Sequence, residues 1–171
     1  MSISINGRAR CFGDGVNTDY IISSRRKRES LDPAVLKQYL FETIAPEFAA
    51  SVRAGDILVA GKNFGCGSAM EVGVTAVVGA GIKVVLAQSF ARTYFRNAVN
   101  NGLYAIECDT SRIGEGAALQ IELGAHVIVR CDGCAEPLRA APIAPEMLAI
   151  LDAGGLVPYL LRHPAFSLQY P

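Results

Sequence analysis

The order of apolar and polar residues along the chain predicts an alternation of strands and helices. Three short apolar runs have the length and composition of buried strands. They are GDILVAG at 55–61, KVVLAQ at 83–88 and LYAIEC at 103–108. The segment 68–81 between the first two runs is rich in small and apolar residues and predicts a buried helix, and 89–102 has a helical pattern that stops at Gly102. The succession strand, helix, strand, helix, strand predicts an α/β fold.

The flanking segments add further expected elements. Residues 3–13 mix apolar and polar positions as a strand does, and glycine, aspartate and asparagine then break the pattern into a loop at 13–19. The segment 32–44 begins with a capping aspartate and a proline and has apolar residues on one helical face. This pattern predicts a helix. The alternation at 117–133, turning at Gly124, predicts a hairpin, and 144–160 predicts a short helix with a glycine stop.

Composition narrows the classes of partner. The 171 residues suit one domain, and 16 basic residues balance 16 acidic ones, so no overall charge favours nucleic acid or an anionic membrane. No apolar run approaches the ~20 residues of a membrane span, and five cysteines suit reduced thiols better than a disulfide framework. We expect a cytoplasmic protein without nucleic-acid or membrane partners. The one local excess of charge is SRRKRES at 24–30.

The turn KNFGCGS, after the first apolar run, holds the main candidate for chemistry. Gly65 and Gly67 allow positive φ angles and close approach of a ligand. Ser68 with Glu71 forms the S-x-x-E pattern of a capping box, worth about 1 kcal/mol of helix stability. The same position at a helix N-terminus also suits a substrate carboxylate or a serine oxygen that becomes anionic. The local pattern leaves both roles open, and the phosphate-binding P-loop order is absent.

Four segments occur in order over nearly the whole chain: GDGVNTDYII, AGDILVAGKNFGCGS, GIKVVLAQSFARTYFRNAVNNGL and GGLVPYLLRH. Together they resemble the small subunit of isopropylmalate isomerase and of homoaconitase, in the aconitase superfamily. The resemblance implies one swivelling β/β/α domain over 1–171, with a mixed sheet or barrel flanked by helices. It also implies that the hairpin and helix from about residue 117 to 171 form an appendage.

The resemblance further implies an activity that needs two chains. A large subunit holds a [4Fe–4S] cluster, the small subunit binds no metal, and the site between them isomerises a hydroxy di- or tricarboxylate by dehydration and rehydration. The small subunit is inactive alone. The leading expected substrate is 3-isopropylmalate, in leucine biosynthesis. If the isolated chain self-associates, the apolar segment GGLVPYLL is a candidate surface.

Matching the motifs position by position implies roles for single residues. Ser68 becomes the base that takes the carbon-bound proton, flanked by Gly67 and Ala69 at the substrate. Asp19 becomes the acidic residue at the edge of the site, presented by Asn17 and Thr18. The segment 24–30 corresponds to the loop that selects the substrate, so its cations are expected to bind it; they are Arg25, Arg26 and Arg28.

One departure from the family pattern concerns the substrate. Where relatives read Ser-Arg-Glu after the catalytic serine, with an arginine that grips a carboxylate, this chain reads Ala69-Met70-Glu71. Losing such a charge-assisted contact costs ~1.5–3 kcal/mol. The substrate could differ, with homoaconitate, citramalate and dimethylmalate as candidates, or a cation of 24–30 could replace the clamp. A third alternative is a non-catalytic paralogue that serves as an interaction module.

For the remaining candidate residues, the sequence favours structural roles. Cys66 is interpreted as a small turn residue. The C-x-x-C pair Cys131 and Cys134 has the spacing of half a zinc site, but no second pair follows, so a turn with two thiols is favoured. His126 and His163 are isolated. Three further residues are expected to support the glycine turn from the helix behind it: Arg92, Arg96 and Asn97.

Overall fold

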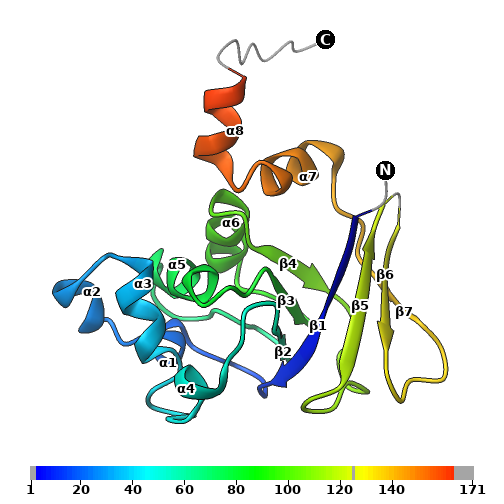
Figure 1. Cartoon of the computed structure of the whole chain (residues 1–171), viewed down its shortest axis with the longest axis horizontal. Coiled ribbons are helices and arrows are strands. Elements are labelled where there is room, and N and C mark those ends of the chain that lie inside the picture. The colour runs from blue at the N-terminus through cyan, green and yellow to red at the C-terminus, as the bar shows by residue number, and fades with distance from the viewer. Residues whose placement is uncertain (1–2, 125, 164–171) are drawn as a thin grey trace.

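The computed structural model describes residues 3–124 and 126–163 and contains one seven-stranded sheet in the order β4-β3-β2-β1-β5-β6-β7 (Figure 1). The strands are β1 (Ile3–Cys11), β2 (Ile57–Ala60), β3 (Val84–Ala87), β4 (Tyr104–Glu107), β5 (Ala118–Leu123), β6 (Val127–Cys131) and β7 (Leu138–Ala140). The helices are α1 (Thr18–Ile21), α2 (Arg26–Glu29), α3 (Pro33–Leu36), the 3-10 helix η1 (Lys37–Tyr39), α4 (Phe48–Ser51), α5 (Val72–Gly79), α6 (Arg92–Asn100), α7 (Pro145–Asp152) and α8 (Leu156–Arg162).

The central strand β1 divides the sheet into two halves. On one side β1, β2, β3 and β4 are parallel, and on the other β1, β5, β6 and β7 are antiparallel. The outer edges of the two halves meet at an antiparallel bridge between Cys108 and Ala140, next to a 2.9 Å bond from Ala141 N to Glu107 O. The sheet is therefore nearly closed, which confirms the expected mixed sheet flanked by helices.

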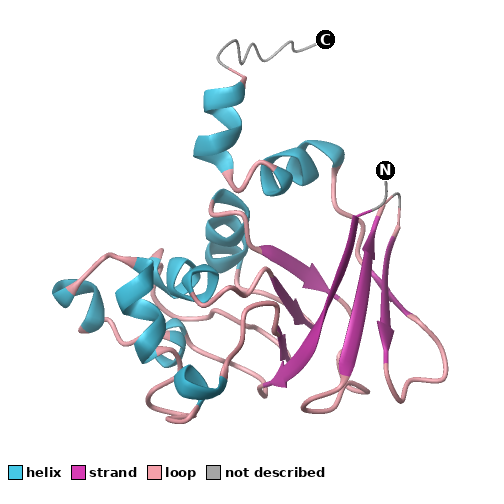
Figure 2. Ribbon diagram, in the orientation of Figure 1, coloured by secondary structure: helices cyan, strands magenta, loops and turns pink. Residues whose placement is uncertain are grey.

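Both faces of the parallel half are buried. In β2, Leu58 and Ala60 pack into a core under the helices that Figure 2 shows beside the parallel strands, whereas Ile57 and Val59 belong to a second core inside the curled sheet. Side chains alternate between faces along a strand, so a strand covered on both sides needs apolar residues at every position. This explains the continuous apolar runs that mark β2 and β3 in the sequence.

The predicted strands and the helix at 89–102 are confirmed, but two other helices differ from expectation. The helix expected at 32–44 stops after η1, because Phe41 takes a positive φ of 56° and is fully buried with its N–H bonded to Ile21 O at 2.9 Å. The helix expected at 68–81 begins only at Val72.

The expected hairpin consists of β5 and β6, and β5 pairs with β1 over six residue pairs, so the hairpin is part of the main sheet. The glycine stop of the last region is confirmed at Gly154 and Gly155, whose φ values are 89° and 119°. A further helix, α8, follows it and was not expected. In the described ranges, 3–124 and 126–163, no helix combines the length and apolarity of a membrane span.

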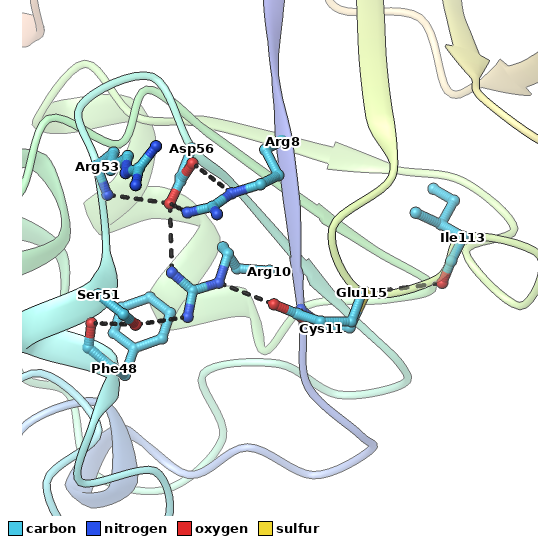
Figure 3. Close-up of polar contacts among 9 residues, drawn as sticks. All are labelled: Arg8, Arg10, Cys11, Phe48, Ser51, Arg53, Asp56, Ile113 and Glu115. Atoms are coloured by element: carbon cyan, nitrogen blue, oxygen red, sulfur yellow. Dashed lines mark hydrogen bonds and ion pairs between the residues drawn. The ribbon is translucent and has the colours of Figure 1, made fainter.

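A charged cluster joins β1 to the start of β2 (Figure 3). The Asp56 side chain, 5% exposed, accepts hydrogen bonds from Arg8 Nη2 at 2.9 Å, Arg10 Nη1 at 3.3 Å and the backbone N–H of Arg53 at 3.0 Å. Burial alone would raise the pKa of Asp56, but the bonds from Arg8, Arg53 and Arg10 outweigh it and leave the pKa lowered. The cluster fixes the parallel strands whose far ends carry the candidate site.

Candidate functional site

Two loops that leave adjacent parallel strands lie against each other. Residues 12–17 follow β1 and residues 61–71 follow β2, and both begin at the carboxyl edge of the sheet, where ligands bind in open α/β sheets. Four backbone hydrogen bonds join residues 13–18 to residues 61–66. They run from Gly15 N to Lys62 O at 2.7 Å, from Gly61 N to Gly13 O at 3.1 Å, from Gly65 N to Val16 O at 2.8 Å and from Thr18 N to Cys66 O at 2.8 Å.

Ser68 lies exposed on the second loop and is not a helix cap. The buried Thr18 hydroxyl, on a residue only 2% exposed, donates to the Ser68 carbonyl at 2.9 Å. No backbone N–H of the described residues donates to this carbonyl, and α5 begins only at Val72, so Ser68 is not the N-cap. Glu71 is the N-cap instead, with no side-chain capping bond, and its carboxylate accepts from Asn101 at 3.3 Å. The expected capping box is therefore wrong.

Polar groups around Ser68 are available to a ligand. In residues 3–124 and 126–163, the Ser68 hydroxyl and the N–H groups of Gly67, Ser68 and Ala69 bond to no other protein group. All three residues are exposed. Three successive donors beside a free hydroxyl can bind a carboxylate or stabilise an oxyanion.

Close packing holds the turn in shape. Gly65 and Gly67 have φ angles of 76° and 94°. A Cβ atom on Gly65 would lie 2.2 Å from the ring of Tyr94, and one on Gly67 would lie 2.5 Å from the amide oxygen of Asn17. Tyr94 is buried, which raises its pKa, and its hydroxyl donates to Gly73 O at 3.3 Å. Sequence reasoning missed Tyr94, because an aromatic residue in a helical pattern has no signal that distinguishes this support from ordinary core packing.

Asp19 connects the Ser68 loop to the basic segment. It lies in the first turn of α1, where Asn17 Oδ1 accepts from its N–H at 2.9 Å. One oxygen of its own carboxylate accepts from the N–H of Ser24 at 3.0 Å, at the start of the 24–30 segment. Since the preceding residue, Thr18, bonds to the Ser68 carbonyl, the structure brings the Asp19 and Ser68 segments together.

The three arginines of 24–30 have different surroundings. Arg26 donates to both oxygens of Glu42, at 3.1 and 2.8 Å, and to Glu29 at 2.9 Å, and its guanidinium lies 3.8 Å from the centre of the Tyr39 ring. The hydrogen bond from Arg26 lowers the pKa of Glu42. Arg25 and Arg28 are exposed and make no ion pair within the described ranges. Arg26 thus anchors the segment, and Arg25 and Arg28 are its available arginines.

Met70 lies in the core. It is 4% exposed and belongs to the apolar cluster under the helices, together with Tyr94 and Val74. The chain turns inward between the exposed Ala69 and the start of α5. The side chain at position 70 therefore fills space beneath the site and does not face a ligand.

Cys66 belongs to the second loop, and the two histidines lie outside this site. The Cys66 thiol donates to Gly15 O at 3.4 Å, within the loop contact. His163 stacks on Tyr159, and His126 is exposed. Among the residues that the structure describes, no group of three or more histidine, cysteine, aspartate or glutamate side chains is arranged to hold a metal ion.

Comparisons with known proteins identify the family. The Aconitase C-terminal domain model matches residues 38–111. A 3-isopropylmalate dehydratase small subunit from Methanosarcina mazei is 42% identical over 157 residues, covering 91% of this chain and 95% of the relative. The isopropylmalate/citramalate isomerase small subunit of Methanocaldococcus jannaschii is 41% identical, covering 98% of this chain and 99% of the relative.

The chain belongs to the 3-isopropylmalate dehydratase small-subunit family. A crystal structure of a family member from Methanocaldococcus jannaschii has a TM-score of 0.86 and 37% identity, and it covers 95% of this chain and 96% of that one. Because the match spans both chains almost entirely, the two proteins share the same overall fold. The fold and membership expected from the four motifs are thus confirmed.

Proposed function

We propose that this chain is the small subunit of a heteromeric hydro-lyase that isomerises 3-isopropylmalate and 2-isopropylmalate in leucine biosynthesis. The observation that carries the proposal is the placement of Ser68. Its hydroxyl is exposed and makes no hydrogen bond to the residues that the structure describes, while its carbonyl accepts a hydrogen bond from the buried Thr18 hydroxyl. This is the arrangement expected of a proton-transfer group, since the residue is free to react and its backbone is held.

In this proposal Ser68 Oγ removes the proton from the substrate carbon. A serine hydroxyl is a weak base, so its anionic form needs donors in a site closed to water. The N–H groups of Gly67 to Ala69 supply such donors either to that oxygen or to a substrate carboxylate. Asp19 lies at the edge of the same site, and closure of a partner over the exposed loop would exclude water.

The large subunit supplies what this chain lacks. Among the described residues, no three cysteine, histidine or carboxylate side chains are arranged to bind a [4Fe–4S] cluster. The proposal therefore assigns the cluster, and the activation of the leaving hydroxyl, to the partner. The small-subunit names of the relatives support such a partner.

Arg25 and Arg28 are proposed to contact the variable part of the substrate or its second carboxylate. They are exposed cations of the segment 24–30, which Arg26 anchors to Glu42 and the N–H of Ser24 connects to Asp19. A multiply charged acid is suited to arginine because the guanidinium can bind a carboxylate with two hydrogen bonds.

A second candidate is the same reaction on another acid, such as citramalate, dimethylmalate or homoaconitate. The observation that favours it is Met70, whose burial leaves position 70 without a carboxylate clamp. One relative is itself named for both isopropylmalate and citramalate. In this case Arg25 and Arg28 would bind a substrate with a different arrangement of carboxylates.

The test is turnover by the assembled enzyme. The chain is co-expressed with its large subunit, the cluster is reconstituted without oxygen, and the unsaturated intermediate is followed by ultraviolet absorbance with each acid in turn. Activity that Ser68→Ala abolishes supports the proposal and identifies the substrate. Ser4→Ala is the matched control, because Ser4 is exposed at the opposite end of β1. A stable complex with an intact cluster that turns over none of the acids would instead indicate a non-catalytic interaction module.

A further inference from the structure

The C-x-x-C sequence forms a tight turn that brings its two thiols together. Cys131 ends β6, and the N–H of Cys134 donates to the carbonyl of Cys131 at 3.1 Å. Between them Gly133 has a φ of 86°, as the third residue of a type II turn requires. The first and fourth Cα atoms of such a turn lie within about 7 Å. A disulfide spans Cα separations of roughly 4.4–6.8 Å, so the backbone already has a suitable geometry.

The surroundings of the two thiols differ. Cys134 is partly exposed, and its thiol lies 3.7 Å from the carbonyl of Arg112. Cys131 is buried, and its thiol lies 3.2 Å from the carbonyl of Asp132. Burial and then the adjacent Cys134 raise the pKa of Cys131 to about 11. Cys134 is therefore the thiol that a reagent meets first.

A third thiol lies close to this pair. Cys11, at the carboxyl end of β1, also contributes to the raised pKa of Cys131. Its own thiol points to the carbonyl of Ile113 at 3.6 Å, and both residues appear in Figure 3. Cys11 is a competing partner, so the experiment must distinguish it from Cys134. Within residues 3–124 and 126–163, no three-ligand metal site is formed by this or any other group.

We propose that Cys131 and Cys134 form a reversible disulfide, so that the turn at 131–134 is a thiol–disulfide exchange site for small disulfides such as glutathione disulfide. This site is separate from Ser68 and does not depend on the proposed catalytic function.

The exchange takes place in two balanced steps. The Cys134 thiolate attacks one sulfur of glutathione disulfide, the S–S bond of the reagent breaks, and one glutathione leaves as thiolate. The Cys131 thiolate then attacks the sulfur of Cys134 in the mixed disulfide and releases the second glutathione. The protein loses two electrons and two protons, and the reagent becomes two thiols.

The ring that this disulfide closes contains only four residues, so it removes less entropy from the unfolded chain than a long loop would. We expect the oxidised protein to melt at most a few degrees above the reduced one. The modification would change the chemistry and shape of the turn without acting as a structural crosslink.

The experiment equilibrates the full chain, without oxygen, in graded ratios of oxidised to reduced glutathione. Free thiols are then trapped with an alkylating reagent under denaturing conditions, and the masses of the tryptic peptides are measured by mass spectrometry. Cleavage after Arg130 and Arg139 places Cys131 and Cys134 together in one peptide that holds no other cysteine. We expect this peptide to lose two hydrogen atoms and both alkyl groups as the ratio rises, and to regain them on reduction, while Cys66 stays alkylated.

Two variants test the order of attack. Cys131→Ala should leave Cys134 as a stable mixed disulfide with glutathione, and Cys134→Ala should leave Cys131 alkylated. Cys66→Ala is the matched control, and circular dichroism verifies folding of all three. The proposal is overturned if both cysteines stay alkylated at the most oxidising ratio. It is equally overturned if Cys134 is joined to Cys11 in a crosslinked pair of peptides.

Discussion

Replacement of Thr18 by valine tests whether the Ser68 loop is positioned by the first residue of α1. Valine keeps the shape of threonine and removes only the hydroxyl that donates to the Ser68 carbonyl at 2.9 Å. Because Ser68 is exposed, water can solvate the freed carbonyl, so the net loss is that of an ordinary hydrogen bond. We expect the free energy of unfolding to fall by about 1 kcal/mol.

The expected effect of Thr18→Val on catalysis is larger than its effect on stability. Without the Thr18 hydroxyl, the Ser68 backbone loses the contact that fixes it, so the exposed Ser68 hydroxyl can shift from its position. A displacement of about 1 Å in a reacting group costs up to ~100-fold in rate. We therefore expect kcat in the assembled enzyme to fall between about 10-fold and 100-fold, with little change in KM.

The assays are urea denaturation of the isolated chain and steady-state kinetics of the complex with its best substrate. Thr18→Ser keeps the hydroxyl and serves as the rescue control, with kcat close to the original value. An unchanged kcat in Thr18→Val, alongside the expected loss of stability, would refute the positioning role and leave Thr18 as a purely structural residue.

Three further changes test the surrounding structure. Asp56→Asn should lower the free energy of unfolding by about 2 kcal/mol at neutral pH. Because folding lowers the pKa of Asp56, its contribution to the free energy of unfolding is complete above the unfolded pKa of about 4. This contribution is lost as the pH falls through the folded pKa. The free energies of unfolding of the two proteins should therefore converge in acid. Gly65→Ala should cost about 2 kcal/mol or more in thermal melts, compared with about 1 kcal/mol for the control Gly15→Ala, whose Cβ meets nothing within 4 Å. Arg26→Ala should speed amide hydrogen exchange across 24–30, whereas Arg28→Ala should raise KM and leave exchange unchanged; equal exchange in both would contradict the anchoring role.

The sequence predicts a strand or helix well when the burial of that element alone sets its pattern of apolar residues. β2 and β3 are buried on both faces, so their continuous apolar runs are visible without knowledge of the fold. The loop before α5 is not predictable in this way, because its Ser68 carbonyl is held by Thr18, which lies 50 residues earlier in the chain. The three residues of β7 likewise form a strand through distant partners, β6 and the bridge from Ala140 to Cys108.

The candidate site shows the same division. The motifs predict that Ser68 and Asp19 belong to one site, and their segments do meet at the carboxyl edge of β1 and β2. A run of cations, however, does not reveal which of them is already bound within the protein. Arg26 is distinguished by Glu42 and Tyr39, which lie more than ten residues away and come close only in the folded chain. Side-chain partners of this kind require the structure.

Position 70 allows the question of substrate to be tested directly. If Met70 were a lost clamp facing the substrate, Met70→Arg would restore binding of isopropylmalate at little structural cost. The structure predicts otherwise, since Met70 is 4% exposed within the apolar core. A guanidinium there would be buried without a partner, and we expect the free energy of unfolding to fall by about 3 kcal/mol or more.

Met70→Leu is the matched control and should cost less than about 1.5 kcal/mol, because it conserves volume and apolar character. Urea denaturation and turnover of isopropylmalate are measured for both variants. If Met70→Arg keeps its stability and raises kcat/KM for isopropylmalate, an arginine at position 70 must reach the substrate. That result would mean that the loop between Ser68 and α5 can turn its side chains outward. If stability falls and kcat/KM does not rise, selection of the acid depends on Arg25 and Arg28, which are then the residues to change next.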